Sequence, residues 1–307
     1  MSLAIAMPSL QVAAVLFVGW FQLLALFHTF PQVDILTARA FFQSTPCPET
    51  ATAGQVCGSF FYSNQPDMIA VRKVLFYLPW AAAVLMIALL LRDRQPAPLP
   101  ARNGILVDML DALLWGPRTL VARLRSSHDS KPSGSKQLQR SAADAPRMTV
   151  SEQACPPADT GLSAKLGLML VSLLLGPYVL VNLLIKEFSG RPRPYQTDIF
   201  GGDMVFMPAG SFGGECARNC SFVSGEGAAA GWLFCLILLL PSRNRLLLVP
   251  LILFGSLFTP ALRVAFGGHY LSDVILGWLS SLVVVALVMG VAEVLRLMKK
   301  REAGVET

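Results

Sequence analysis

Uncharged apolar stretches of membrane-spanning length are the feature that most restricts how this sequence of 307 residues can fold. A transmembrane helix needs about 20 apolar residues to cross roughly 30 Å of hydrocarbon. Six stretches fit, and they predict an all-α, polytopic membrane protein whose six-transmembrane helix bundle makes residues 1–307 a single integral membrane domain. The stretches are residues 10–30, 74–91, 166–185, 221–240, 246–262 and 274–292.

The composition excludes several other classes of protein. Charged residues make up 14% of the chain, hydrophobic residues make up 54%, and the mean hydropathy is +0.56. A disordered chain, a collagen-like chain and an ordinary soluble enzyme are all more polar. A net charge of +6 could indicate nucleic acid, but a nucleic-acid binder gathers its basic residues on one surface. Here most basic residues flank apolar stretches, so the expected partner is the lipid bilayer, with no nucleic acid.

Basic residues also predict the orientation of the chain. With six spans both termini lie on one side, and that side holds 17 of the 25 Lys and Arg: eleven from residue 92 to 165, two between the fourth and fifth spans, and four in the tail. Cytoplasmic loops carry such an excess. We therefore predict a multi-pass protein of the cell (inner) membrane with both termini cytoplasmic. No charged residue occurs before Asp34, and no basic segment precedes the first span, so we expect it to be retained.

A long connection, residues 92–161, separates the second and third spans. Residues 126–159 are rich in Ser, Pro, Lys and Asp, which predicts a flexible cytoplasmic stretch. Upstream, at about residues 103–125, apolar residues recur at helical spacing with Asp108 and Asp111 on the opposite face. This amphipathic helix lies either in the membrane interface or packed beneath the bundle, and both interpretations stay open.

Four of the six cysteines fall in the two predicted exterior loops. Disulfides form in oxidising compartments, and we expect Cys47 to pair with Cys57 and Cys216 with Cys220, although four cysteines allow three connectivities. Zinc is the competing interpretation. No histidine stands beside these cysteines, which weighs against it.

Two motifs flank the loop between the third and fourth spans. The segment 186–194 carries Lys186, Arg191 and Arg193, a cluster that suits an anion or lipid headgroups. The second motif opens the fourth span with Ser224 and Gly225. Backbone N–H groups at such a helix start favour an anion, but the same residues also serve as plain caps.

A third motif is more specific. Arg263 is followed by His269 and Asp273, with two glycines permitting a tight turn before the sixth span. Two other histidines occur, His28 in the first span and His128 in the cytoplasmic loop, and neither has comparable charged neighbours. Because the third and fifth spans end, and the fourth and sixth begin, on the same side, all three motifs can converge at the exterior membrane surface. The expected occupant is a phosphate.

These motifs resemble the type 2 phosphatidic acid phosphatase family, whose signature runs Lys-x6-Arg-Pro, Pro-Ser-Gly-His and Ser-Arg-x5-His-x3-Asp. Lys186 and Arg193-Pro194 match the first element, and Arg263, His269 and Asp273 match the third, with Leu262 in place of serine. The middle element reads Val223-Ser224-Gly225-Glu226, so its proline and histidine are replaced. The resemblance implies a phosphatase-like core over residues 166–292.

The resemblance also implies roles for these residues. His269 would attack phosphorus and form a phosphohistidine, with Asp273 orienting the imidazole. The phosphate-binding groups would be Lys186, Arg193, Arg263 and the N–H groups near Ser224 and Gly225. Positioning and charge stabilisation supply most of the catalysis in phosphoryl transfer, so this arrangement requires no metal and no cofactor.

Glu226 stands where the family has its general-acid histidine. A carboxyl group held protonated by burial and by the phosphate's charge can do the same work. Alternatively, Glu226 forms a salt bridge with Arg193 or Arg263 in the empty site.

The leading hypothesis is a lipid phosphate phosphatase that hydrolyses a phosphomonoester or diphosphate of a membrane lipid at the exterior membrane face. A phosphotransferase that passes the phosphoryl group to a second lipid remains open. So does a non-catalytic protein that binds or transports a lipid phosphate, because polar residues within spans often line transport routes.

Overall fold

The computed structural model describes residues 8–50, 54–93 and 160–302. Contacts divide the chain into two units, Met1–Arg92 with Gly161–Thr307, and Asp93–Thr160. The amphipathic helix and the flexible stretch expected at residues 103–125 and 126–159 lie outside the described residues.

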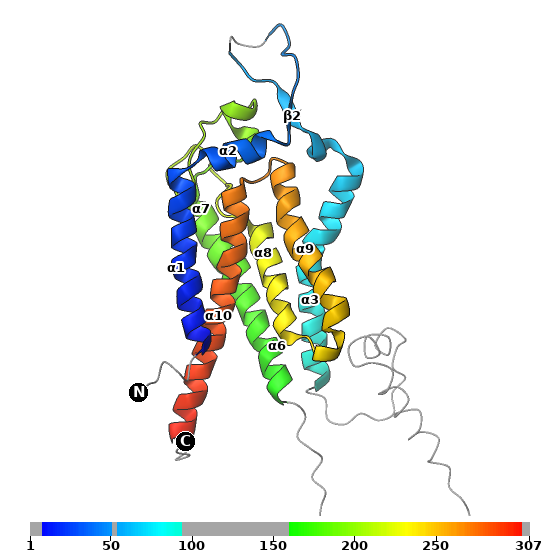
Figure 1. Ribbon diagram of the computed structural model, residues 1–307, viewed down its shortest axis with the longest axis vertical. Helices are drawn as coiled ribbons and strands as arrows, with labels where there is room; N and C mark the ends of the chain where they lie inside the picture. Colours follow the sequence, from blue (N-terminus) through cyan, green and yellow to red (C-terminus); the bar gives the residue numbers. More distant parts are fainter. Residues whose placement is uncertain (1–7, 51–53, 94–159, 303–307) are drawn as a thin grey trace, which may run out of the picture. The chain divides into compact units, whose positions relative to one another are not determined.

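The described chain is mainly helical, as Figure 1 shows, and five of its helices are long and apolar enough to cross a membrane. The predicted all-α, polytopic membrane fold is confirmed. The fourth expected span is a shorter apolar helix, Gly225–Leu239, so the count of six stays a prediction. The helices are α1 (Pro8–Thr29), α3 (Pro66–Asp93), α6 (Thr160–Leu173) with its π-helical continuation η3 (Leu174–Ile185), α8 (Gly225–Cys235), α9 (Arg245–Ala265) and α10 (Leu271–Glu302).

Short elements cover one end of this bundle. Strands β1 (Phe42–Ser44) and β2 (Gly58–Phe60) form a small antiparallel hairpin, which the sequence analysis did not predict. The hairpin follows α2 (Gln32–Arg39), which lies across the end of the bundle (Figure 1). The remaining short elements are η2 (Phe61–Asn64), α7 (Lys186–Ser189), η4 (Pro194–Gln196), η5 (Asp198–Phe200), η6 (Leu236–Leu239) and η7 (Ser242–Asn244).

Helix direction alternates through the bundle, which places the ends of several helices together. At one end, Ser9 near the start of α1 donates a hydrogen bond through Oγ to Glu293, late in α10, at 2.5 Å. The opposite end contains the first turns of α3, α8 and α10 and the last turns of η3 and α9 (Figure 1). All three sequence motifs lie at this second end.

Glycines let α8 and α10 approach closely near that end. A Cβ atom on Gly231 would lie 2.2 Å from the carbonyl oxygen of Trp278, and one on Gly277 would lie 2.5 Å from that of Ser224. Larger side chains at these positions would force the two helices apart. The glycines therefore hold the start of α8 against the start of α10.

The chain opens α8 at Ser224, whose Oγ accepts a hydrogen bond from the N–H of Gly227 at 3.1 Å. This is the N-cap that the Ser-Gly pair predicts. Ser224 is fully buried, and its own N–H donates to the carbonyl oxygen of Asp273 at 2.9 Å. The cap thus joins the second motif directly to the third.

Candidate active site

A cavity of about 750 Å³ opens at the motif end of the bundle. The convergence predicted from the sequence is present, since all three motifs contribute to its lining. Ser224 caps the helix that borders the cavity, and Asp273 lies beside His269. The predicted site residues that line it are Lys186, Arg193, Gly225, Glu226, Arg263 and His269.

The geometry around His269 fixes which imidazole nitrogen carries the proton. His269 is 1% exposed, and its Nδ1 lies 2.8 Å from the carbonyl oxygen of Ser221. A carbonyl oxygen only accepts, so Nδ1 is the donor and Nε2 holds the lone pair. Burial lowers the pKa of the imidazole to about 4, because a buried site disfavours the charged form. His269 is therefore neutral, with its lone pair on Nε2.

Asp273 contacts this histidine less directly than expected. Its Oδ2 lies 3.8 Å from His269 Nδ1, beyond hydrogen-bond range. The same oxygen accepts from Ser221 Oγ at 2.5 Å and from the N–H of Tyr270 at 2.9 Å. Ser221 is thus a bridge, because its hydroxyl binds the carboxylate and its carbonyl oxygen binds the imidazole.

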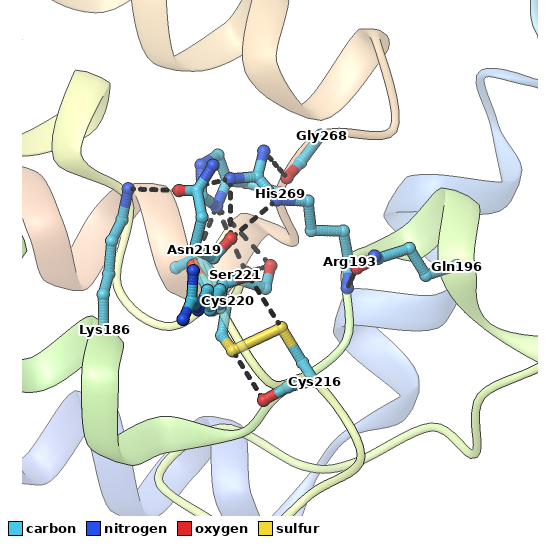
Figure 2. The surroundings of a disulfide bond; sticks show 11 residues. Lys186, Arg193, Gln196, Cys216, Asn219, Cys220, Ser221, Gly268 and His269 are labelled. Carbon is cyan, nitrogen blue, oxygen red and sulfur yellow. Dashed lines mark hydrogen bonds and ion pairs between the residues drawn. A yellow bond between two sulfur atoms is a disulfide. The ribbon is translucent and has the colours of Figure 1, made fainter.

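Asn219 organises two of the predicted cations (Figure 2). Its Oδ1 accepts from Arg193 Nη2 at 2.9 Å and from Lys186 Nζ at 3.4 Å. Asn219 has a φ of 51°, in the left-handed region that asparagine tolerates better than most residues. The amide therefore holds both positive groups at the edge of the cavity.

Both predicted disulfides are present. Cys47 pairs with Cys57 across the hairpin loop, and Cys216 pairs with Cys220. The second bridge closes a short loop that contains Asn219 and leads directly into Ser221 (Figure 2). The bridge therefore restrains Asn219, which contacts the cations, and Ser221, which contacts His269.

Glu226 is ion-paired with two arginines. Its Oε1 lies 2.6 Å from Arg72 Nη2 and 3.4 Å from Arg263 Nε. Of the two alternative partners considered from the sequence, Arg193 and Arg263, the ion pair is with Arg263. Arg72, on the first turns of α3, is a further partner that was not expected from the sequence. Arg263 Nε is buried and, apart from its ion pair with Glu226, makes no hydrogen bond among the described residues.

The cavity continues away from the charged groups as an apolar groove. One wall is α3 and the other is α6 with η3, so the groove runs along the bundle at membrane depth. From Arg72 to Ile87 the α3 wall spans roughly 22 Å at the rise of an α-helix. Its apolar lining includes Leu75, Phe76, Pro79, Trp80, Ala83, Val84, Leu170, Leu173, Leu174, Pro177 and Tyr178.

Four contributors to the site escaped the sequence analysis: Arg72, Asn219, Ser221 and Arg191 in its observed role. Arg72 is a charge inside a long apolar helix, which is a recognisable signal because such charges are costly and usually functional. Asn219 lies in a loop without a readable motif, and Ser221 begins the predicted fourth span without a pattern that marks its contacts. Arg191 was noted only as part of a basic cluster, yet it is fully buried and bonds to Asp273.

Comparison with known proteins decides the family. A model of the PAP2 superfamily matches residues 165–296. The chain belongs to this superfamily. Membership confirms the resemblance that the first and third motifs indicated.

Curated relatives extend the similarity over nearly the whole chain. A lipid A 4'-phosphatase of Rhizobium etli is 39% identical over 278 residues, which are 91% of this chain and 86% of that protein. One of Rhizobium leguminosarum is 38% identical over 91% of this chain and 95% of its own length. One of Francisella tularensis subsp. novicida is 37% identical over 34% of this chain. No solved structure gives a significant match.

This PAP2 chain is therefore a multi-pass membrane lipid phosphatase, a phosphomonoester hydrolase whose candidate site lies at one end of a helical bundle.

Proposed function

We propose that this chain removes the 4'-phosphate of lipid A at the exterior face of the membrane. The observation that carries this proposal is the similarity over 91% of the chain to proteins named lipid A 4'-phosphatase. The cavity supports it, because one end gathers four cationic side chains and the rest is an apolar groove at membrane depth. A phosphorylated lipid needs a cationic surface for its phosphate and an apolar surface for its hydrocarbon chains.

The proposed exterior location has two supports. The end of the bundle that carries the site also carries both disulfides, which form in oxidising compartments. The opposite end holds the connection through η7, with Arg243 and Arg245, and the basic end of α10, in accord with the excess of basic residues in cytoplasmic loops. Both termini are then cytoplasmic.

In the proposed mechanism, the His269 Nε2 lone pair attacks phosphorus while the bond to the leaving sugar oxygen breaks. The equatorial oxygens are held by Lys186, Arg193 and Arg263 and by the N–H groups at the start of α8. These contacts stabilise charge that the nucleophile alone cannot. The product is a phosphohistidine and a free hydroxyl, and water then attacks phosphorus and releases inorganic phosphate.

Glu226 supplies the proton to the leaving oxygen in this mechanism. Arg72 and Arg263 neutralise its carboxylate in the structure. A bound phosphate dianion competes for these arginines, and its negative charge favours the neutral carboxylic acid. The neutral acid donates to the leaving oxygen, and the carboxylate that results accepts a proton from the attacking water.

The first prediction tests the nucleophile. His269→Ala should lower phosphate release from lipid A on the order of 10⁴-fold or more, because no other group can take its place. Purified enzyme would be assayed for inorganic phosphate and for lipid A lacking one phosphate by mass spectrometry. His28→Ala is the matched control, because His28 Nδ1 contacts the carbonyl oxygen of Ala209 instead of the site.

Trapping completes this test. Parent enzyme quenched in alkaline detergent should carry a base-stable, acid-labile phosphoryl group that the His269→Ala variant lacks. Substantial phosphate release by that variant would sink the phosphohistidine. Turnover of other phospholipids but not of lipid A would reject the proposed substrate while keeping the family's activity, and an added acceptor lipid that gains phosphate would reveal a phosphotransferase.

The second prediction tests the acid. Glu226→Gln should lower kcat about 10²-fold and remove the alkaline limb of the pH profile, since an amide can hydrogen-bond but cannot release a proton. Glu226→His should recover part of the activity. An unchanged rate and profile in Glu226→Gln would leave the glutamate only its ion pair.

A further inference from the structure

A fully buried arginine lies behind the candidate site. Arg191 has no exposed surface, so it is not a phosphate ligand. Its guanidinium donates from Nη1 to Asp273 Oδ1 at 2.5 Å, from Nη2 to Asp34 Oδ2 at 2.8 Å, and from Nε to the carbonyl oxygen of Met207 at 2.9 Å. One face lies 4.3 Å from the ring centre of Tyr270. Such a rigid fork fixes the direction of both carboxylates.

Asp34 is the second carboxylate, and it comes from α2, far from the motifs in sequence. It is fully buried and also accepts from the N–H of Ser272 at 2.8 Å and from Ser272 Oγ at 2.6 Å. Ser272 Oγ in turn accepts from Arg191 at 2.9 Å. A buried charge is costly unless it is paired and hydrogen-bonded, and Asp34 is both.

Hydrogen bonds lead from this pair to the imidazole. Asp273 Oδ2, on the far side of the carboxylate from Arg191, accepts from Ser221 Oγ. The carbonyl oxygen of Ser221 then accepts from His269 Nδ1 at 2.8 Å. The path from Asp34 to His269 therefore runs through Arg191, Asp273 and Ser221 without a gap.

We propose that Asp34 on α2 is a positioning residue for His269, acting through Arg191, Asp273 and Ser221. Asp34 holds Arg191 in the orientation that turns Oδ2 of Asp273 toward Ser221, and Ser221 holds Nδ1 as the protonated nitrogen so that Nε2 faces the substrate. The proposal rests on the proposed function in taking His269 as the nucleophile. Residues 165–296, which match the superfamily, do not include α2, so this role is not part of the motif.

The test replaces Asp34 with asparagine. Asp34→Asn keeps the shape of the side chain but removes its charge. Arg191 and Ser272 both donate hydrogen bonds to Asp34, so the NH₂ group of the asparagine must face a donor on one of them. We expect kcat to fall about tenfold to a hundredfold, as small misplacements of reacting groups do, while inhibition by inorganic phosphate stays unchanged because the cavity cations are intact. The matched control is Asp67→Asn, an exposed carboxylate in the first turn of α3 at the same end.

A spectroscopic readout separates positioning from mere folding and does not depend on turnover. The chain has three histidines, so ¹⁵N-imidazole NMR of detergent-solubilised protein resolves each ring, and His269→Gln assigns the signal. The parent and Asp67→Asn should show His269 as the Nδ1–H form at pH 7. Asp34→Asn should show a mixture of both neutral forms, with the His28 signals unchanged.

Ser272→Ala provides a milder second variant, because it removes one contact to each of Asp34 and Arg191 and retains all charges. It should shift the His269 signals in the same direction by a smaller amount. The proposal is overturned if both variants keep the parent's His269 signals, whether or not their activity falls. Failure of the parent to release phosphate would instead reject the proposed function and leave the NMR result decisive for the positioning role.

Discussion

At the scale of single residues, His269 connects burial with a pH dependence. Because burial lowers its pKa to about 4, the imidazole stays neutral throughout the range from pH 5 to 7. Protonation occupies the lone pair of Nε2, so kcat/KM, which reports the pKa values of the free enzyme, should lose its histidine only as the pH drops through about 4. Initial rates at substrate concentrations well below KM measure this limb. A histidine limb in kcat/KM centred near 6.5, the ordinary value for histidine, would contradict the shielded imidazole.

The site residues that the sequence could reveal are those that lie close together along the chain. Arg263, His269 and Asp273 share one turn between two helices, and their spacing alone indicates chemistry. Asp34 is separated from Ser272, its hydrogen-bond partner, by most of the chain. Only the packing of α2 against the start of α10 joins them, and no local pattern encodes that contact.

At the scale of elements, helix bounds followed the apolar stretches because hydrocarbon length and hydropathy determine where a span can lie. The departures arise where other forces act. The fourth stretch begins as helix at Gly225 instead of residue 221, because Ser221 and Ser224 are held by Asp273 and the backbone bends there to reach it. The apolar pattern of residues 221–240 could not reveal these hydrogen bonds to Asp273, because Asp273 lies in another helix.

The disulfide between Cys216 and Cys220 makes a prediction at this scale. Replacing both cysteines with serine frees the loop that carries Asn219, which holds Arg193 and Lys186. Charge-assisted hydrogen bonds of this kind contribute about 1.5–3 kcal/mol, so inhibition by inorganic phosphate should weaken about tenfold or more. The control is the equivalent double variant of Cys47 and Cys57. Equal inhibition constants in the two variants would show that the bridge does not organise the cations.

At the scale of the whole molecule, the alternation of helix direction explains why distant motifs meet. At the site end, the ends of η3 and α9 bring cations, and the start of α8 exposes N–H groups and a carboxylate. The sequence could predict this convergence since each crossing reverses direction. The alternation of helix direction also places Arg72 at the site, because α3 begins at the site end.

Orientation across the membrane is the last property that the arrangement predicts. We place the site end outside and the η7 end inside, so exposed cysteines introduced at the two ends should differ in accessibility. Asp67→Cys lies at the site end and Ser242→Cys at the opposite end, and both positions are exposed.

In a background with Cys155→Ser, a membrane-impermeant thiol reagent applied to intact spheroplasts should label Asp67→Cys at once and Ser242→Cys only after permeabilisation, since a charged reagent cannot cross the hydrocarbon. The background without an introduced cysteine gives the baseline, because its remaining free thiol, Cys235, is buried and its other cysteines are paired. The reverse pattern would place the site in the cytoplasm and exclude a substrate presented from the outer leaflet.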